Sequence, residues 1–437
     1  MAEPKSKLAV NPPVFFISGG LLVLFLAFGV TATATASRVF STVLDAISTH
    51  FGWLYVISVA FFIGFALWLL FSRYADVRLG DDDEEPQFSR LTWFAMLFSA
   101  GMGIGLVFYG VAEPMMHYEN PPDVPGGTLV AAKRALPVTF FHWGLHAWSI
   151  YVLMALGIAY FSFRRKLPLA IRSCFYPLLG ERIHGWLGHL IDILGVFGTL
   201  FGLATSLGLG AMQVSAGLRH LFGVSHGMQT QLILIAVITL AATISLATGV
   251  ERGIRRLSEL NLVLGGLLMV FVFVVGPTLF IVNTLVENLG RYLNEIFTRS
   301  FRVVALSGGE GEWMKSWTLF YWGWWIAWSP FVGMFVARVS RGRRIREFIL
   351  GVLLVPTGVT FAWFSVFGGT ALHLELFGGG GIAQAVSDDL ATAIYVVLER
   401  LPLGSITAFL AAAVVTVFFV TSSDSASFVV DMLTSGG

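Results

Sequence analysis

Apolar residues recur along the whole chain in runs separated by short polar segments. Each run is about 20 residues long, the length that an α-helix needs to cross the hydrocarbon core of a bilayer. The pattern predicts an all-α polytopic membrane protein with ten spanning helices. We expect them at residues 13–34, 52–72, 92–112, 137–161, 189–216, 228–249, 261–287, 315–337, 347–373 and 403–432.

Basic residues gather in every second connection between these spans. Lys and Arg in short loops stay cytoplasmic during membrane insertion, so these connections and the N-terminus are expected in the cytoplasm. The start also resembles a signal peptide, but run 13–34 exceeds the roughly 7–15 apolar residues of a signal-peptide core, and we expect it to be retained. The basic residues are Lys5, Lys7, Arg73, Arg78, Arg90, Arg164, Arg165, Lys166, Arg172, Arg182, Arg252, Arg255, Arg256, Arg338, Arg341, Arg343, Arg344 and Arg346.

The composition agrees with a membrane protein. Charged residues make up 12% of the chain and hydrophobic ones 56%, whereas about a quarter of the residues in soluble domains are charged. This excludes a water-soluble enzyme and a nucleic-acid binder. Lys and Arg number 27 against 26 Asp and Glu, so net charge indicates no partner. The single cysteine, Cys174, cannot form an internal disulfide.

Two connections have the pattern of amphipathic helices. Residues 289–303 and 386–400 each place apolar side chains on one helical stripe, and we expect both helices to lie along the outer interface. The acidic run 81–85 lies in a cytoplasmic connection and is interpreted as a solvated loop without chemistry.

The third span contains three glycines at alternate positions, Gly101, Gly103 and Gly105. Each glycine costs a helix about 1 kcal/mol relative to alanine. One interpretation is close packing between helices, for which Gly101 and Gly105 have the right spacing. The other is an unwound segment whose free backbone groups line a cavity and bind ions or anionic groups. We favour the second.

Aromatic side chains cluster near the middle of two spans, rather than at the helix ends where an interfacial belt would lie. Rings without a counter-charge suit a quaternary ammonium group, which each ring attracts by about 0.5–2 kcal/mol. The carboxylates Glu113, Asp192 and Asp424 are expected nearer to helix ends or breaks. The aromatic residues are Trp143, Trp148 and Tyr151 in the fourth span, and Tyr321, Trp322, Trp324, Trp325 and Trp328 in the eighth.

His142 and His146 are four residues apart in the fourth span. Such a pair can bind haem or a metal ion, which would make the chain a membrane redox protein. No third ligand is evident in a neighbouring span, so we expect a structural role. An aromatic-lined channel is another alternative, and it would conduct without saturation.

The tenth span carries the hydroxyl-rich sequence Thr421-Ser422-Ser423-Asp424-Ser425. Its hydroxyls can bond harmlessly to backbone carbonyls of the preceding turn. Alternatively, Thr421 and Ser422 form a cation site together with carbonyls released by the break in the third span. Sodium is the expected ion.

The stretches 101–117, GMGIGLVFYGVAEPMMH, and 317–351, WTLFYWGWWIAWSPFVGMFVARVSRGRRIREFILG, resemble the betaine/carnitine/choline transporter family. The resemblance implies the leucine-transporter-like inverted-repeat fold with twelve spans, of which the last two are expected to be missing here. It also implies a homotrimer in a bacterial inner membrane. The implied units are a cytoplasmic tail at 1–12, two accessory spans at 13–91, a first five-helix repeat at 92–288, an interfacial helix at 289–314, and a second repeat at 315–437, truncated after its third span.

The resemblance also implies binding residues. The family's aromatic cage matches Trp143, Trp148, Tyr151 and Trp325, and the same pathway includes Trp324, Trp328, Gly101, Met102, Gly103 and Gly105. A sodium site matches Ser99, Met102, Phe418, Thr421 and Ser422. A second sodium site would use Thr199 and Phe331, but Leu203 replaces one of its two threonines, which puts that site in doubt.

These features together predict a sodium-coupled carrier that imports glycine betaine or a similar solute by alternating access. No catalytic residue and no cofactor are expected, apart from sodium as the coupling ion. Gly105 supplies no charge, which favours a zwitterion over choline. A proton-coupled or coupling-free carrier of choline or carnitine is the alternative that Leu203 leaves open.

Overall fold

The computed structural model describes residues 10–101, 103–247, 253–305 and 310–436, and within these ranges it contains helices and no strand. Short 3-10 helices lie at Ile171–Phe175, Gly180–His184 and Leu390–Thr392, and π-helical turns at Tyr160–Arg164 and Lys315–Leu319. The α-helices are α1 (Pro12–Thr31), α2 (Thr33–Phe71), α3 (Arg90–Gly101), α4 (Ile104–Glu119), α5 (Leu129–Trp143), α6 (Leu145–Ala159), α7 (Tyr176–Leu179), α8 (Trp186–Phe222), α9 (Met228–Ala247), α10 (Gly253–Val275), α11 (Thr278–Ser300), α12 (Glu310–Met314), α13 (Phe320–Val339), α14 (Ile345–Phe377), α15 (Ile382–Asp388), α16 (Ala393–Glu399) and α17 (Gly404–Ser435).

Seven helical stretches among the described residues are long and apolar enough to cross a membrane, with α5 and α6 counted as one stretch. The bent pair α10 and α11 makes an eighth if it is one span. The two remaining predicted spans are 92–112, which is divided between the short helices α3 and α4, and 315–337, which contains α13. The count of ten spans therefore stays a prediction, although a helix lies at each expected place.

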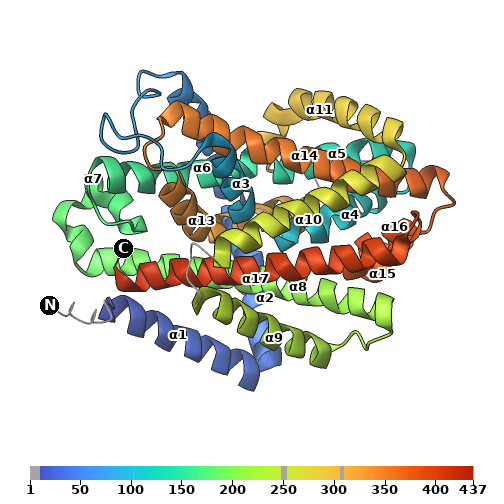
Figure 1. The fold of residues 1–437 in the computed structure, drawn as a ribbon, viewed down its shortest axis with the longest axis horizontal. Helices are drawn as coiled ribbons and strands as arrows, with labels where there is room; N and C mark the ends of the chain where they lie inside the picture. Colours follow the sequence, from blue (N-terminus) through green and yellow to red (C-terminus); the bar gives the residue numbers. More distant parts are fainter. Residues whose placement is uncertain (1–9, 102, 248–252, 306–309, 437) are drawn as a thin grey trace.

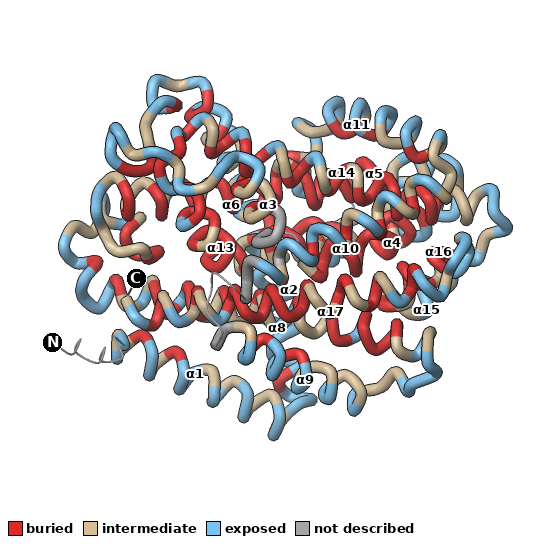
Figure 2. The backbone as a smooth tube through the Cα atoms, viewed as in Figure 1, coloured by how far each residue is buried: buried red, intermediate tan, exposed pale blue. Residues whose placement is uncertain are grey.

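The long helices pack lengthwise against one another (Figure 1). Helix α17 runs along α8 and α10, and α13 lies against α6 and α8. Buried positions concentrate in α4, α13, α14 and α17, whereas α1, α9 and α11 at the periphery expose many side chains (Figure 2). Several of these are large and apolar, such as Phe16 and Val30 of α1. An apolar surface of this kind is expected to face lipid.

The seventh predicted span, 261–287, is wrong at its end. Helix α10 stops at Val275, and α11 begins at Thr278 with its axis turned by 108°. Pro277 has no backbone N–H and its ring disfavours a continuous helix, so the chain turns there. The amphipathic helix predicted at 289–303 is the second half of α11.

The segment predicted as one amphipathic helix at 386–400 consists of three short pieces. They are the end of α15, a 3-10 turn and α16. Ile394 and Val397 are fully buried within the protein, and α16 packs against α17 and α4. The apolar stripe therefore faces protein.

The acidic run 81–85 joins two basic connections, so its interpretation as a free solvated loop is incomplete. Lys166 donates to Asp81 at 2.8 Å and Arg164 to Asp82 at 2.5 Å. Glu84 also pairs with Arg341. The connections that contain residues 81–85, Arg164 and Arg341 therefore lie together at one end of the helices, as the distribution of basic residues predicts.

The fourth predicted span, 137–161, is broken at Gly144, and the sequence analysis missed this break. Helix α5 ends at Trp143, Gly144 takes φ −94° and ψ −140°, and α6 begins at Leu145. A Cβ atom on Gly144 would lie 2.5 Å from the carbonyl oxygen of Phe140 and 2.8 Å from the ring of Phe361. Glycine is required because no other residue fits this close approach.

We expect Gly144→Ala to destabilise the protein by about 1–3 kcal/mol, the usual cost of overpacking a core. The result would be a Tm in detergent several degrees below that of the parent protein. Gly64→Ala is the matched control, because nothing lies within 4 Å of a Cβ atom at Gly64. Equal Tm values for the two variants would contradict the steric argument.

The eighth predicted span contains Gly323 and Pro330, two residues that favour an interruption, but neither breaks it. Helix α13 continues through both Gly323 and Pro330. A proline leaves the carbonyl four residues earlier, here that of Ile326, without its backbone donor. The hydroxyl of Ser329 donates to this carbonyl at 2.8 Å. The side-chain hydrogen bond replaces the missing backbone bond, so the helix persists.

Candidate functional site

The break predicted in the third span is confirmed. Helix α3 ends at Gly101, Gly103 is extended with φ −126° and ψ −151°, and α4 begins at Ile104. Met102 and the side chains of residues 98–101, which include the predicted ligand Ser99, lie outside the described part of the chain. The first N–H groups of a helix have no partner within it, so the start of α4 offers free donors.

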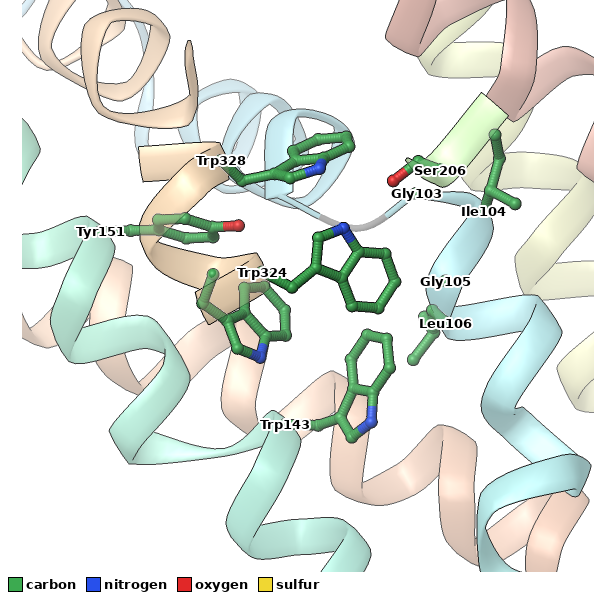
Figure 3. Close-up of a pocket in the computed structure, with 10 residues that line it drawn as sticks. Gly103, Ile104, Gly105, Leu106, Trp143, Tyr151, Ser206, Trp324 and Trp328 are labelled. Atoms are coloured by element: carbon green, nitrogen blue, oxygen red, sulfur yellow. The ribbon is translucent and has the colours of Figure 1, made fainter. Parts of the chain in front are cut away.

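A cavity opens at this break. Side chains from α5, α6 and α13 gather on one side of it, facing the start of α4 and one residue of α8 (Figure 3). Ser206, Ile104 and Leu106 were not predicted from the sequence. The lining residues are Gly103, Ile104, Gly105, Leu106, Trp143, Tyr151, Ser206, Trp324, Trp325 and Trp328.

Trp325 is at the centre of the aromatic cage. Its ring centroid lies 5.3 Å from that of Trp143 and 5.3 Å from that of Tyr151, with interplanar angles of 87° and 69°. Its indole Nε1 donates to the carbonyl oxygen of His142 at 3.1 Å. The Gly144 break lies directly after Trp143, so α5 contributes its last residue to the cage and α6 contributes Tyr151 from its middle.

Trp148, the fourth predicted cage residue, does not line the cavity. It is fully buried, and its ring centroid lies 5.4 Å from Tyr151 and 6.5 Å from Trp325. Its role as a cage residue stays a prediction. Trp148 packs against the rings that form the wall and supports them.

Gly105 lies directly beneath two indoles. A Cβ atom there would lie 2.8 Å from Cη2 of Trp324 and 3.0 Å from Cη2 of Trp143. The absence of a side chain at this position allows both rings to approach the backbone of α4.

The most important residue that sequence reasoning missed is Glu113. It was expected near a helix end without a role, but it lies within α4 and is fully buried. Its Oε2 accepts from Trp143 Nε1 at 2.6 Å and from the hydroxyl of Tyr321 at 2.5 Å. Its Oε1 lies 2.7 Å from Nδ1 of His142 and 3.2 Å from Nε2 of His117. The sequence contains one indication of this buried cluster, because Glu113 and His117 are one helical turn apart in an apolar segment.

The alternative of His142 and His146 as one ligand pair has no support in the geometry. The two histidines lie on opposite sides of the Gly144 break, and Nε2 of His146 instead lies 2.6 Å from the hydroxyl of Ser300. A different trio, Glu113, His117 and His142, brings potential metal-ligand atoms within 4.8 Å of one another. Both histidines contact Oε1 of Glu113, and Trp143 and Tyr321 donate to Oε2, so both carboxylate oxygens already have hydrogen-bond partners.

The two hydroxyl residues of the predicted sodium site lie near the break. Ser422 Oγ would be 3.3 Å from a Cβ atom on Gly103. Thr421 Oγ1 lies 3.1 Å from the carbonyl oxygen of Phe418 and accepts from Nδ2 of Asn261 at 2.8 Å. Oδ1 of the buried Asn261 has no hydrogen-bond partner among the described residues. The sequence did not indicate this amide group beside Thr421.

The predicted second ion site is less complete. Thr199 is buried in α8 and its hydroxyl has no hydrogen-bond partner in the structure. Phe331 is also buried and packs on Trp328, with 5.3 Å between the ring centroids. Leu203 offers no oxygen ligand on the next turn of α8.

Comparisons with known proteins agree with the resemblance. The family description "BCCT, betaine/carnitine/choline family transporter" matches residues 13–437. A probable glycine betaine transporter of Desulfitobacterium hafniense is 45% identical over 424 residues, which are 97% of this chain and 84% of that protein. Glycine betaine transporter OpuD of Bacillus subtilis is 47% identical over 425 residues, 97% of this chain and 82% of the relative. The high-affinity choline transport protein of Escherichia coli is 42% identical over 435 residues, 100% of this chain and 64% of the relative. With a family match over nearly its whole length, the chain belongs to the betaine/carnitine/choline transporter family of multi-pass membrane transporters.

Proposed function

We propose that the protein imports glycine betaine by sodium-coupled alternating access. The observation that carries this proposal is the cavity in which tryptophan and tyrosine rings face the start of α4. It pairs a surface that attracts cations with a helix N-terminus that attracts anions. A zwitterion whose two charges are one carbon atom apart matches both ends.

The trimethylammonium group would lie between Trp143, Tyr151 and Trp325. Such a group cannot donate hydrogen bonds, so ring faces suit it better than oxygen atoms do. The carboxylate would accept from backbone N–H groups near Gly103 and Ile104, the arrangement by which half-helices bind anionic substrate groups in many transporters. Relatives named as glycine betaine transporters favour this solute.

Sodium would bind beside the same break. The hydroxyls of Thr421 and Ser422 and the carbonyl of Phe418 supply oxygen atoms on α17, and the chain around Met102 would supply more. Each sodium ion that enters down a potential of about 100 mV contributes about 2.3 kcal/mol before its concentration gradient is added. Because the ion and the solute share the break, each would favour the conformation that binds the other.

The fold proposed with this mechanism is the leucine-transporter-like inverted repeat. Helices α3 and α4 would open the first repeat, 92–288, and α13 the second, 315–437. The proposed location is a bacterial inner membrane with the N-terminus in the cytoplasm, and the proposed assembly is a homotrimer. Rocking of the two opening spans would expose the cavity to each side in turn.

The second candidate is a proton-coupled or coupling-free carrier of choline or carnitine. It is favoured by the incomplete second ion site at Thr199 and Leu203, and by the relative that is named as a choline transport protein.

Uptake of labelled glycine betaine into proteoliposomes distinguishes the two proposals. We expect saturable uptake that requires an inward sodium gradient and is driven further by an inside-negative potential. Labelled choline should enter more slowly under the same conditions. Glycine betaine uptake that is unaffected by sodium would reject sodium coupling, and faster choline uptake would support the second candidate.

A further inference from the structure

Glu113 is separated from the cavity by a single side chain. The ring of Trp143 lines the cavity, and its indole Nε1 donates to the Glu113 carboxylate at 2.6 Å. Trp143 thus contacts the cavity with its ring and a buried carboxylate with its N–H group. Sequence reasoning expected an aromatic cage without a counter-charge, and this arrangement differs from it.

The hydrogen bonds around Glu113 are those of an ionised carboxylate. A carboxylate accepts up to about four hydrogen bonds, and Glu113 has four neighbours placed to donate them. Trp143 can only donate. Among the described residues Nδ1 of His117 has no hydrogen-bond partner, and Nε2 is the atom placed to donate to Glu113. These hydrogen bonds place the negative charge of Glu113 directly behind Trp143.

Two arginine side chains close to His142 are already paired with acidic residues. Arg299 and Arg302 line a second cavity next to His142. Each of them already has its own acidic partner, Glu295 at 2.5 Å and Glu310 at 2.7 Å. The negative charge of Glu113 therefore acts on the cavity through Trp143.

We propose that Glu113 is a positioning and specificity-determining residue that makes the cavity select a cationic head group over a neutral one of the same shape. It fixes the orientation of Trp143 and places an anion behind its ring. An indole N–H that donates to a carboxylate makes the ring face more negative, and an anion in a dry interior attracts a cation beyond contact distance. The inference rests on the proposed function, because it takes a quaternary ammonium solute as the ligand.

The test compares glycine betaine with 3,3-dimethylbutanoate, in which a carbon atom replaces the nitrogen and the positive charge is lost. Dissociation constants of both compounds are measured by tryptophan fluorescence on the purified protein in sodium buffer. The parent protein should prefer glycine betaine. Glu113→Gln should weaken glycine betaine binding by about tenfold, the scale of one cation–π contact, and should leave 3,3-dimethylbutanoate binding nearly unchanged.

Tyr321→Phe is the matched control, because it removes one donor to Glu113 and keeps the carboxylate. It should retain the preference for the cationic head, even if both ligands bind more weakly. The inference is overturned if Glu113→Gln weakens both ligands equally, as a purely structural residue would, or if it changes neither. It is also overturned if Tyr321→Phe abolishes the preference for glycine betaine over 3,3-dimethylbutanoate. This second outcome tests the inference even if Glu113→Gln does not fold. A parent protein that binds no glycine betaine would instead reject the proposed function itself.

Discussion

Replacing Trp325 with alanine should raise the half-saturating concentration of glycine betaine by about thirtyfold or more. The indole lies 5.3 Å from two other rings of the aromatic cage, so its removal opens the wall between Trp143 and Tyr151. A desolvated cation–π contact contributes about 2 kcal/mol, and every 1.4 kcal/mol is about a factor of ten in affinity. The hydrogen bond to His142 is lost as well. Concentration-dependent uptake into proteoliposomes measures the effect.

Two further variants distinguish a loss of ligand binding from a loss of folded protein. Trp325→Phe keeps a ring and should retain part of the affinity. Trp186→Ala removes a tryptophan that is 60% exposed at the start of α8, and it should leave uptake unchanged. Equal losses in Trp325→Ala and Trp186→Ala would indicate a general loss of folded protein. An unchanged half-saturating concentration in Trp325→Ala would place the ligand elsewhere.

Hydropathy located the long helices well, because the mean hydropathy of a segment decides whether it can lie in the lipid. Helices α9, α14 and α17 begin within a few residues of the predicted spans 228–249, 347–373 and 403–432. The three alternate glycines also predicted the break between α3 and α4 correctly. Both signals are local, so the sequence alone contains them.

The errors at Gly144 and Pro330 concern features that depend on packing and on side-chain hydrogen bonds. Gly144 breaks a span because of the approach of Phe361, 217 residues away. Pro330, which looked like a break, is accommodated because Ser329 donates to the free carbonyl of Ile326. A glycine or proline in an apolar run therefore indicates a possible break, and the packing around it decides the outcome.

The role of Glu113 could not be predicted from its surroundings in the sequence. Its donors come from three different segments, with Trp143 at 30 and Tyr321 at 208 residues of separation. A carboxylate in an apolar span is costly unless it is satisfied in this way. Its presence indicates that partners exist, but only the fold identifies them. The same holds for Asn261, whose position beside Thr421 joins α10 to α17.

Replacing Ser422 with alanine should weaken the binding of the sodium ion that drives uptake. The Ser422 hydroxyl lies beside Gly103 at the break, next to Thr421 on the same helix. Unwound backbone and hydroxyl oxygens are the groups that bind sodium in transporters with broken helices. Loss of one oxygen ligand should raise the sodium concentration for half-maximal uptake by about tenfold, a change of about 1.4 kcal/mol. Sodium-dependent initial rates at saturating glycine betaine measure it.

Ser427→Ala is the matched control on the same helix, because the Ser427 hydroxyl is already bonded to the carbonyl oxygen of Ser423 at 2.8 Å. It should leave the sodium dependence unchanged. Glycine betaine binding in sodium-free buffer then separates the two sites. In this buffer Ser422→Ala should bind glycine betaine with the same weak affinity as the parent protein. Trp325→Ala should bind it more weakly than either. If Ser422→Ala retains the parent's sodium dependence, the ion does not bind beside the break, and the coupling part of the proposed function fails while the aromatic cage stands.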